Sequence, residues 1–236
     1  TLLCGPRGLD AARLLPGVED IRCWEAPWID PDPDPVRHEH VEALRQTVAA
    51  LDVDEAVVFT SHHQSPLPTA LVLRSAGVGW IGAVSRDYPG SLLDLRLRPA
   101  GVVPEPEAQL RLAVAAGGRL PAGDDGRLRI RDDLPTAAAP VVRAPNRVVL
   151  HPGTSVPARA WPVERYVDTA RLLVERGHDV VVTGAPAERP LTARVAAAAP
   201  GVVDLGGRSP WSILPPLCLG FFVIMVDTTI VNIAVP

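Results

Sequence analysis

The stretch that decides the fold is His151–Tyr166, HPGTSVPARAWPVERY. The apolar run that enters it, Arg147–His151, predicts a buried strand. The run that leaves it, Pro162–Arg176, predicts a helix with proline at its first position and Gly177 just past its end. Backbone N–H groups at a helix N-terminus are unpaired, and the helix dipole favours anions there. A strand, a loop of small residues and a helix therefore predict an α/β domain with an anion-binding loop.

Three side chains of this loop would strengthen such a site. Thr154 and Ser155 supply hydroxyl donors. Arg159 supplies a charged, planar group that suits a diphosphate. An ordinary connecting loop with a surface arginine explains the same residues equally well.

The next predicted strand, 179–183, leads into a second informative turn, Thr183–Glu188 (TGAPAE). Gly184 would allow a close backbone approach at the carboxyl edge of a parallel sheet, where open α/β sheets bind ligands. Glu188 could accept hydrogen bonds from a ribose diol. The alternative for Glu188 is an acid at a helix N-terminus, stabilised by the dipole. A third short strand is expected over 202–205.

Upstream of residue 147, short apolar runs continue to alternate with amphipathic helical patterns, which favours a parallel sheet with helices. The expected strands are 1–4, 21–24, 55–60 and 80–84, and the expected helices are 8–15, 38–51, 67–75 and 105–116. Residues 86–99 read as irregular. We therefore predict a first domain over 1–120, a linker rich in Pro, Gly, Asp and Ala over 121–146, and a second domain over 147–209.

The composition excludes several classes of protein. The formal net charge of the 236 residues is −4, and all 23 basic residues are arginine, so no basic surface predicts nucleic-acid binding. The three cysteines, Cys4, Cys23 and Cys218, have no metal-ligand spacing and suggest no disulfide framework. No signal peptide opens the chain, so a cytoplasmic location is the default expectation. The chain starts at Thr1, and we expect its true N-terminus to lie upstream.

The loop over 151–166 and the turn over 183–188 together resemble a known protein family. The pattern H-P-G-(T/S)-x-x-x-x-(R/K)-x-W-P, followed by a helix and V-V-x-T-G-x-P-x-E, resembles the donor half of glycosyltransferase family 9, which includes the ADP-heptose:lipopolysaccharide heptosyltransferases. The resemblance implies a GT-B fold with two Rossmann-like domains. It also implies that Arg159, helped by Thr154 and Ser155, holds the donor diphosphate and that Glu188 contacts the ribose. Gly184 completes the expected donor-binding residues. The family uses no metal and no cofactor.

The resemblance extends upstream to Ala56–Thr69 (AVVFTSHHQSPLPT), which is similar to the strand and loop of the acceptor domain in this family. His62 and His63 would lie at the edge where a glycan or lipid-linked acceptor docks. They could bind the acceptor or transfer a proton. A pair of loop histidines that touch water is the plainer interpretation.

Two departures from the family pattern lead us to expect a truncated chain in which both domains are incomplete. The family's first strand and its Gly-containing loop, with the Asp usually taken as the general base, would lie before Thr1. No catalytic residue can therefore be assigned here. The later D-T-G-x-x-H segment does not follow Arg208. We expect the chain as given to be inactive.

The end of the chain, 210–236, has a different character. No residue from Ile213 to Val226 is charged, and about 20 apolar residues suffice to cross a bilayer. Leu217–Pro236 resembles the first transmembrane helix of the drug:proton antiporters of the major facilitator superfamily, with Asp227 in the place of the intramembrane acid. A buried helix of the donor domain is the alternative. A transmembrane helix over 212–236 would attach the chain to a membrane, and a reading-frame fusion would explain the change in character.

The expected function is transfer of a sugar, expected to be a heptose, from a nucleotide-sugar donor similar to ADP-heptose to a glycan or lipid-linked acceptor. The alternative is a piece of a drug transporter fused to a nucleotide-binding module without catalytic activity.

Overall fold

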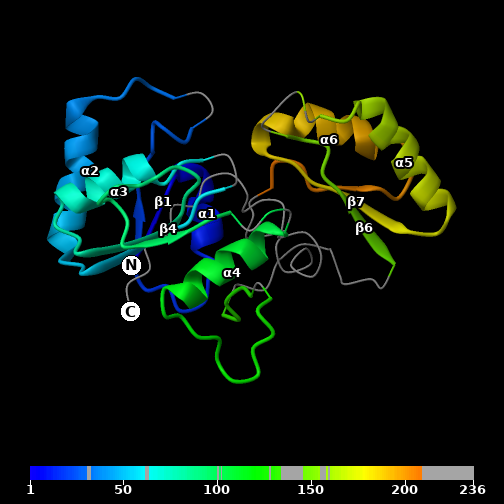
Figure 1. Cartoon of the computed structure of the whole chain (residues 1–236). Coiled ribbons are helices and arrows are strands. Elements are labelled where there is room, and N and C mark those ends of the chain that lie inside the picture. The colour runs from blue at the N-terminus through cyan, green and yellow to red at the C-terminus, as the bar shows by residue number, and fades with distance from the viewer. Residues whose placement is uncertain are drawn as a thin grey trace. The chain divides into compact units, whose positions relative to one another are not determined.

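The computed structural model describes residues 1–30, 33–61, 64–99, 101, 103–127, 129–133, 146–154, 158 and 160–208. These residues fall into two compact units (Figure 1). The first unit contains Thr1–Asp132, and the second begins at Asp133. The helices and strands described in the second unit lie between residues 147 and 204.

The strands of the first unit form two parallel sheets. β1 (Leu2–Cys4) pairs with β2 (Ile21–Cys23), and a three-stranded sheet has the order β3-β4-β5. The bounds of the latter strands are Glu55–Val58, Trp80–Val84 and Leu95–Leu97. Strands that pair in parallel need a crossover between them. The helices of this unit supply most of these crossovers, as the alternating sequence pattern predicts.

The helices of the first unit cover the core. Their bounds are η1 Pro6–Gly8, α1 Leu9–Ala12, α2 His38–Leu51, α3 Leu67–Ser75 and α4 Glu105–Ala115. Leu44 of α2 and Leu73 of α3 are fully buried against Ala56 of β3 and Ile81 of β4. Each such buried leucine stabilises the unit by about 1.5–3 kcal/mol. α2 ends where Asp52 adopts a left-handed conformation with φ 49°.

The second unit has a parallel sheet of order β6-β7-β8, with bounds Arg147–Leu150, Asp179–Val182 and Val203–Asp204. Its helices are α5 (Val163–Glu175), η3 (Pro186–Glu188) and α6 (Arg189–Ala196). Val180 and Val182 point to one face of β7, where they pack with Ala170 of α5 and Val195 of α6. Both helices therefore cover the same face of the sheet, as Figure 1 shows.

The α/β class and the parallel sheets are confirmed, and the predicted bounds of α2, α3 and β4 agree with the structure. Three details were wrong. A strand, β5, lies in the segment expected to be irregular, because Leu95–Leu97 is too short to give a clear alternation. α1 ends at Ala12 rather than residue 15. Pro162 is extended, with ψ 135°, and precedes α5 instead of opening it.

The predicted transmembrane-like helix over 210–236, including Asp227, lies outside the described residues. Among the residues that the structure does describe, no helix has the length and apolar character needed to cross a membrane.

Candidate functional site

The loops that follow β6, β7 and β8 meet at the carboxyl edge of the second sheet. The Thr183 N–H donates to the carbonyl of Leu150 at 2.9 Å, which ties the end of β7 to the end of β6. The Gly207 N–H donates to the carbonyl of Gly184 at 2.9 Å, which ties the loop after β8 to the loop after β7. The two turns on which the sequence analysis depends therefore lie side by side, at the edge where α/β sheets bind ligands.

The carboxylate of Glu188 lies between these two turns. Its Oε2 accepts a hydrogen bond from the Ala185 N–H at 2.7 Å. Its Oε1 lies against Gly153 so closely that a Cβ added at Gly153 would overlap it. The structure thus shows the plainer role of Glu188, the capping of its own turn. A carboxylate has about four acceptor sites, so this hydrogen bond leaves capacity for the hydroxyls of a ligand.

Two further glycines make room for one buried side chain, Thr192 of α6. A Cβ at Gly184 would lie 2.6 Å from Thr192 Cγ2, and a Cβ at Gly206 would overlap Thr192 Oγ1. Thr192 is 0% exposed and donates to the Arg189 carbonyl at 3.1 Å. Gly184 therefore has a packing reason in the protein itself, beside the ligand contact expected from the sequence. We call Gly153, Gly184 and Gly206 the glycine-lined edge.

A polar contact that the sequence analysis missed joins the first two loops. His151 Nδ1 lies 3.1 Å from Thr183 Oγ1, and the tautomer of His151 decides which of the two donates. Thr183 is buried. Each residue directly follows a strand at the same edge, and the parallel pairing of β6 with β7 was the signal that could have predicted their contact.

The remaining predicted donor residues are placed only in part. Thr154 is exposed and follows Gly153 directly. Ser155 and Arg159 lie outside the described residues. The first turn of α5 carries an acid, Glu164, which pairs with Arg194 of α6 at 2.7 Å. Negative charge at a helix N-terminus competes with a bound anion, and the partner arginine offsets part of that charge.

The first unit has a different site at the carboxyl edge of β3-β4-β5. A pocket that is open to solvent lies there. Three arginines line it, Arg86 after β4, Arg98 after β5 and Arg111 on α4, and we call it the arginine pocket. Glu105 is the one acidic residue among its described lining residues. Arginine side chains suit phosphate and carboxylate groups, so this pocket favours an anionic ligand.

The wall of the arginine pocket is held by Gln109 of α4. Its Nε2 donates to the carbonyl of Thr60 at 3.0 Å, which fixes α4 against the end of β3. Ser61 and Gln64 also line the pocket. His62 and His63 lie between these two in the sequence but outside the described residues. Sequence reasoning missed the arginines because Arg86 and Arg98 lie at the two ends of a segment expected to be irregular, and Arg111 lies on a separate helix, α4.

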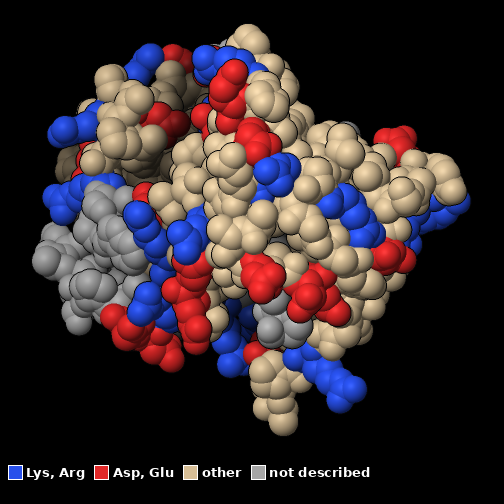
Figure 2. Space-filling view, turned by 90° about the vertical axis from the view of Figure 1, so that its left-hand side faces the viewer, with Lys and Arg blue, Asp and Glu red and all other residues tan. Residues whose placement is uncertain are grey.

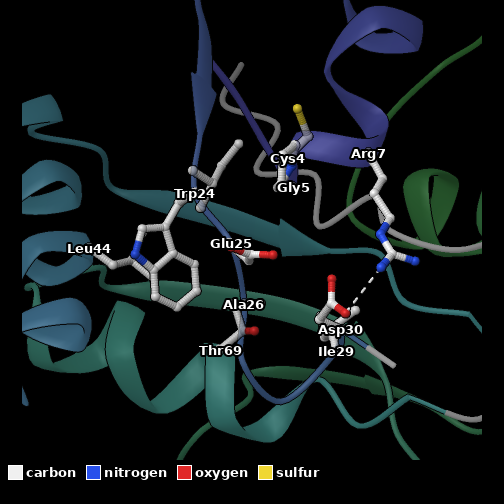
Figure 3. Close-up of a pocket in the computed structure, with 12 residues that line it drawn as sticks. Cys4, Gly5, Arg7, Trp24, Glu25, Ala26, Ile29, Asp30, Leu44 and Thr69 are labelled. Atoms are coloured by element: carbon white, nitrogen blue, oxygen red, sulfur yellow. Dashed lines mark hydrogen bonds and ion pairs between the residues drawn. The ribbon is translucent and has the colours of Figure 1, made fainter. Parts of the chain in front are cut away.

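A smaller pocket lies at the ends of β1 and β2 (Figure 3). Trp24 lines one side and stacks on His40, with ring centres 4.5 Å apart. On the other side, Arg7 pairs with Asp30 at 3.3 Å. The pocket thus combines an aromatic wall with an ion pair.

The part of the chain that the structure describes contains no cluster of side chains suited to a metal ion. No group of three or more metal-ligating residues occurs there. Figure 2 shows acidic and basic side chains mixed over one face of the molecule.

The sequence of the chain matches the family description "Glycosyltransferase family 9 (heptosyltransferase)" over residues 43–229. The chain belongs to glycosyltransferase family 9. The family 9 match includes both edges described above, and it continues past Arg208 into the apolar end of the chain. No curated protein matches the sequence significantly.

Solved structures agree with family 9 at the level of the fold. The E. coli ADP-heptose lipopolysaccharide heptosyltransferase II superposes with a TM-score of 0.58 at 17% identity, covering 89% of this chain and 64% of that one. A family 9 glycosyltransferase from Veillonella parvula gives 0.57 at 12% identity, covering 86% and 58%. The E. coli heptosyltransferase WaaC solved with ADP gives 0.53 at 19% identity, covering 88% and 72%. The chain therefore spans less than two thirds of the length of the first two.

Proposed function

We propose that the protein is a glycosyltransferase that transfers a sugar, expected to be a heptose, from a nucleotide-sugar donor similar to ADP-heptose to a glycan or lipid-linked acceptor. The chain as given, which lacks the expected catalytic residue, stays predicted to be inactive. Membership of family 9 supports sugar transfer as the reaction class. The E. coli heptosyltransferase WaaC, which has a similar fold, was also solved with ADP-2-deoxy-2-fluoro heptose, and this supports the proposed donor. The expected architecture is the GT-B fold, with domains over 1–120 and 147–209 and a linker over 121–146.

The observation that carries the donor assignment is the position of Glu188. Its carboxylate lies at the carboxyl edge of the sheet, between the turns after β6 and β7, with acceptor capacity left after it caps Ala185. We assign it to the nucleoside ribose. Thr154, Ser155 and Arg159 on the neighbouring loop, together with Gly184, would hold the diphosphate. Charge stabilisation of the departing diphosphate would lower the barrier to transfer.

The acceptor belongs on the first unit in this proposal. The arginine pocket opens at the carboxyl edge of β3-β4-β5 and would hold an anionic group of the acceptor. His62 and His63 are the expected acceptor contacts on the segment between Ser61 and Gln64. A metal ion, a cofactor and a nucleic acid have no part in this proposal, and a cytoplasmic location stays a prediction.

The transporter interpretation of 210–236 is the alternative, with Asp227 as its functional acid and membrane attachment through 212–236 as its consequence. The family 9 match runs to residue 229 and so includes most of this segment, which favours a glycosyltransferase origin for it.

The test is a calorimetric titration with ADP and with 2′,3′-dideoxy-ADP. Glu188→Gln keeps an oxygen that can accept from the Ala185 N–H, so the turn is preserved. A hydrogen bond to a charged group contributes about 1.5–3 kcal/mol, so this substitution should weaken ADP binding about tenfold or more. Dideoxy-ADP should bind equally to both proteins, because it lacks the hydroxyls that Glu188 would contact.

Glu175→Gln is the matched control, since it removes one exposed charge at the far end of α5. An equal loss of ADP and dideoxy-ADP affinity in Glu188→Gln would contradict the ribose assignment. Release of ADP from ADP-heptose only in the presence of an acceptor would then show transfer and exclude a module that only binds nucleotide.

A further inference from the structure

Two cysteines of the first unit face each other across neighbouring strands. β1 and β2 pair in parallel with Cys4 opposite Cys23, and each cysteine is the last residue of its strand. The Trp24 N–H donates to the Cys4 carbonyl at 3.0 Å, which holds the strand ends together. Neighbouring strands lie about 4.8 Å apart, within the range of about 4.4–6.8 Å between the Cα atoms of disulfide-bonded cysteines. The backbone spacing therefore fits a disulfide bond.

The two thiols also point to the same face of the sheet. Alternate residues of a strand share a face. Leu2 and Cys4 pack in a buried cluster with Ala12 of α1, and Ile21 packs against that same cluster. Cys23 is two residues beyond Ile21, so it shares the α1 face with Cys4. Figure 3 shows the Cys4 sulfur pointing away from Trp24 and Glu25.

The surroundings of the two thiols differ. Cys4 is 1% exposed, whereas Cys23 is exposed to solvent. Burial, and then the neighbouring Cys23, raise the pKa of the Cys4 thiol to about 11. Cys4 therefore keeps its proton at neutral pH, and a reagent from solvent meets Cys23 first.

We propose that Cys4 and Cys23 form a reversible thiol–disulfide site in which a hydroperoxide oxidises Cys23 and Cys4 then closes the disulfide. The Cys23 thiolate attacks one peroxide oxygen, an S–O bond forms as the O–O bond breaks, and the leaving oxygen departs as water or alcohol. Cys4 loses its proton and attacks the Cys23 sulfur, so the S–S bond forms and the sulfenic oxygen leaves as water. The two thiols are oxidised by two electrons, and one peroxide is reduced.

The disulfide would connect two walls of the smaller pocket. Gly5 follows Cys4, Trp24 follows Cys23, and both line that pocket. The bond would fix the distance between these two segments. This site is independent of the proposed sugar transfer, because none of its residues belongs to the glycine-lined edge or to the arginine pocket.

The experiment uses the full chain with Cys218→Ser, so that the third cysteine cannot contribute. Hydrogen peroxide is added to the folded protein, free thiols are counted, and tryptic peptides are mapped without reduction. Both thiols should disappear in a chain that remains monomeric. Peptide Thr1–Arg7 should be found linked to peptide Cys23–Arg37, and dithiothreitol should restore both thiols.

Two variants separate the steps. In Cys4→Ser, Cys23 should stop at the sulfenic acid, which dimedone traps. In Cys23→Ser, Cys4 should react with peroxide about 100-fold or more slowly, because a thiol with a raised pKa has little thiolate. Circular dichroism of each variant shows whether it is folded, and only folded variants are compared.

The proposal predicts that disulfide formation in the two-cysteine protein speeds up as pH rises, since Cys4 must lose its proton. Dimedone trapping of Cys23 that is equal with and without Cys4 would overturn it. Disulfide-linked dimers as the main product of the folded chain would overturn it too.

Discussion

The carboxyl edges of the two three-stranded sheets differ in chemistry although their topology is the same. β3-β4-β5 ends at a pocket lined by Arg86 and Arg98, with charged side chains directly after the strands. β6-β7-β8 ends at Gly184 and Gly206, where the backbone closes over a buried Thr192. One edge is built for recognition by long cationic side chains, and the other for close approach of backbone groups. The residues that follow each strand decide what an α/β edge can bind.

The amino edges of the same two sheets are alike. Asp94 accepts from the Ile81 N–H at 2.7 Å and pairs with Arg74, and Asp179 pairs with Arg147 across β6 and β7. Burial opposes the charge of Asp94, yet the Ile81 N–H and Arg74 together lower its pKa. An Arg–Asp pair thus stabilises the amino edge of each sheet, opposite the carboxyl edge where open α/β sheets bind ligands.

The largest effect is expected from Gly184→Ala in the glycine-lined edge. The new Cβ would lie 2.6 Å from Thr192 Cγ2, and Thr192 has no space to move because it is fully buried. Overpacking of this kind costs about 1–3 kcal/mol. Urea unfolding should show this loss, and ADP binding should weaken with it because Glu188 is displaced.

Two controls define the cause. Gly79→Ala in the first unit should be nearly neutral, since its Cβ would lie at an ordinary 3.5 Å from the Asp54 carbonyl. Thr192→Ser removes the methyl group that the new Cβ would strike, so it should restore most of the stability in the double variant. If the double variant is no more stable than Gly184→Ala, the packing explanation of Gly184 is wrong.

The next effect concerns the arginine pocket. Arg98→Gln and Arg111→Gln should each weaken binding of inorganic phosphate to the first unit about tenfold, since a charged hydrogen bond contributes about 1.5–3 kcal/mol. The loss should shrink at high salt. ADP affinity should not change, because we propose the donor contacts for the second unit. Chemical-shift titrations with both ligands measure the two affinities.

Arg13→Gln and Arg22→Gln are matched controls, because both arginines belong to the first unit and pair with an aspartate at 3.1 and 3.0 Å. A phosphate affinity that falls equally in these controls would reflect net charge alone. That result would mean that the carboxyl edge of β3-β4-β5 has no specific anion site, and the proposed difference in chemistry between the two carboxyl edges would be wrong.

Much of the fold could be predicted because it depends on local pattern. The alternation of apolar runs with helical periodicity gave α2, α3 and β4 with the bounds observed. β5 was missed because three residues carry too little periodicity, and its place is fixed by pairing with Gly82–Val84 of β4. Long-range pairing of this kind leaves no local signal.

The candidate sites show the same limit. Gly184 and Glu188 were found because one short turn contains both. The contact of Glu188 with Gly153 depends on the pairing of β6 with β7, and the arginine pocket gathers residues from three segments. The sequence analysis explained Gly184 by the close approach of a ligand. The structure adds a packing reason, since Thr192 on α6 fills the space that a side chain at Gly184 would need.

A smaller effect is expected at the amino edges, where the two units should respond alike. Asp179→Asn should cost about 1 kcal/mol, since it leaves Arg147 partly buried without its ion pair. Asp94→Asn should cost less, because Asp94 is 38% exposed.

The lowered pKa of Asp94 means that its contribution to stability is present above the usual value of 3.8 and is lost as pH falls below it. Urea unfolding of each variant at neutral and acidic pH measures these stability losses and their dependence on pH. A change in ADP or phosphate affinity would show that the two ion pairs are not purely structural.

The smallest effect is expected at a surface pair remote from both edges, Glu42 with Arg45 on α2. Two hydrogen bonds of 2.7 Å from Arg45, and then one from Gln46, lower the pKa of Glu42 from 4.5 to about 2. Its stabilisation is therefore complete above 4.5 and is lost as pH falls toward 2. Glu42→Gln should shift the urea midpoint at neutral pH by less than either aspartate variant, because exposed pairs contribute little. The difference from the parent protein should narrow as pH falls below the usual pKa of Glu42. A shift that stays constant with pH would mean that the side chain acts through packing rather than charge.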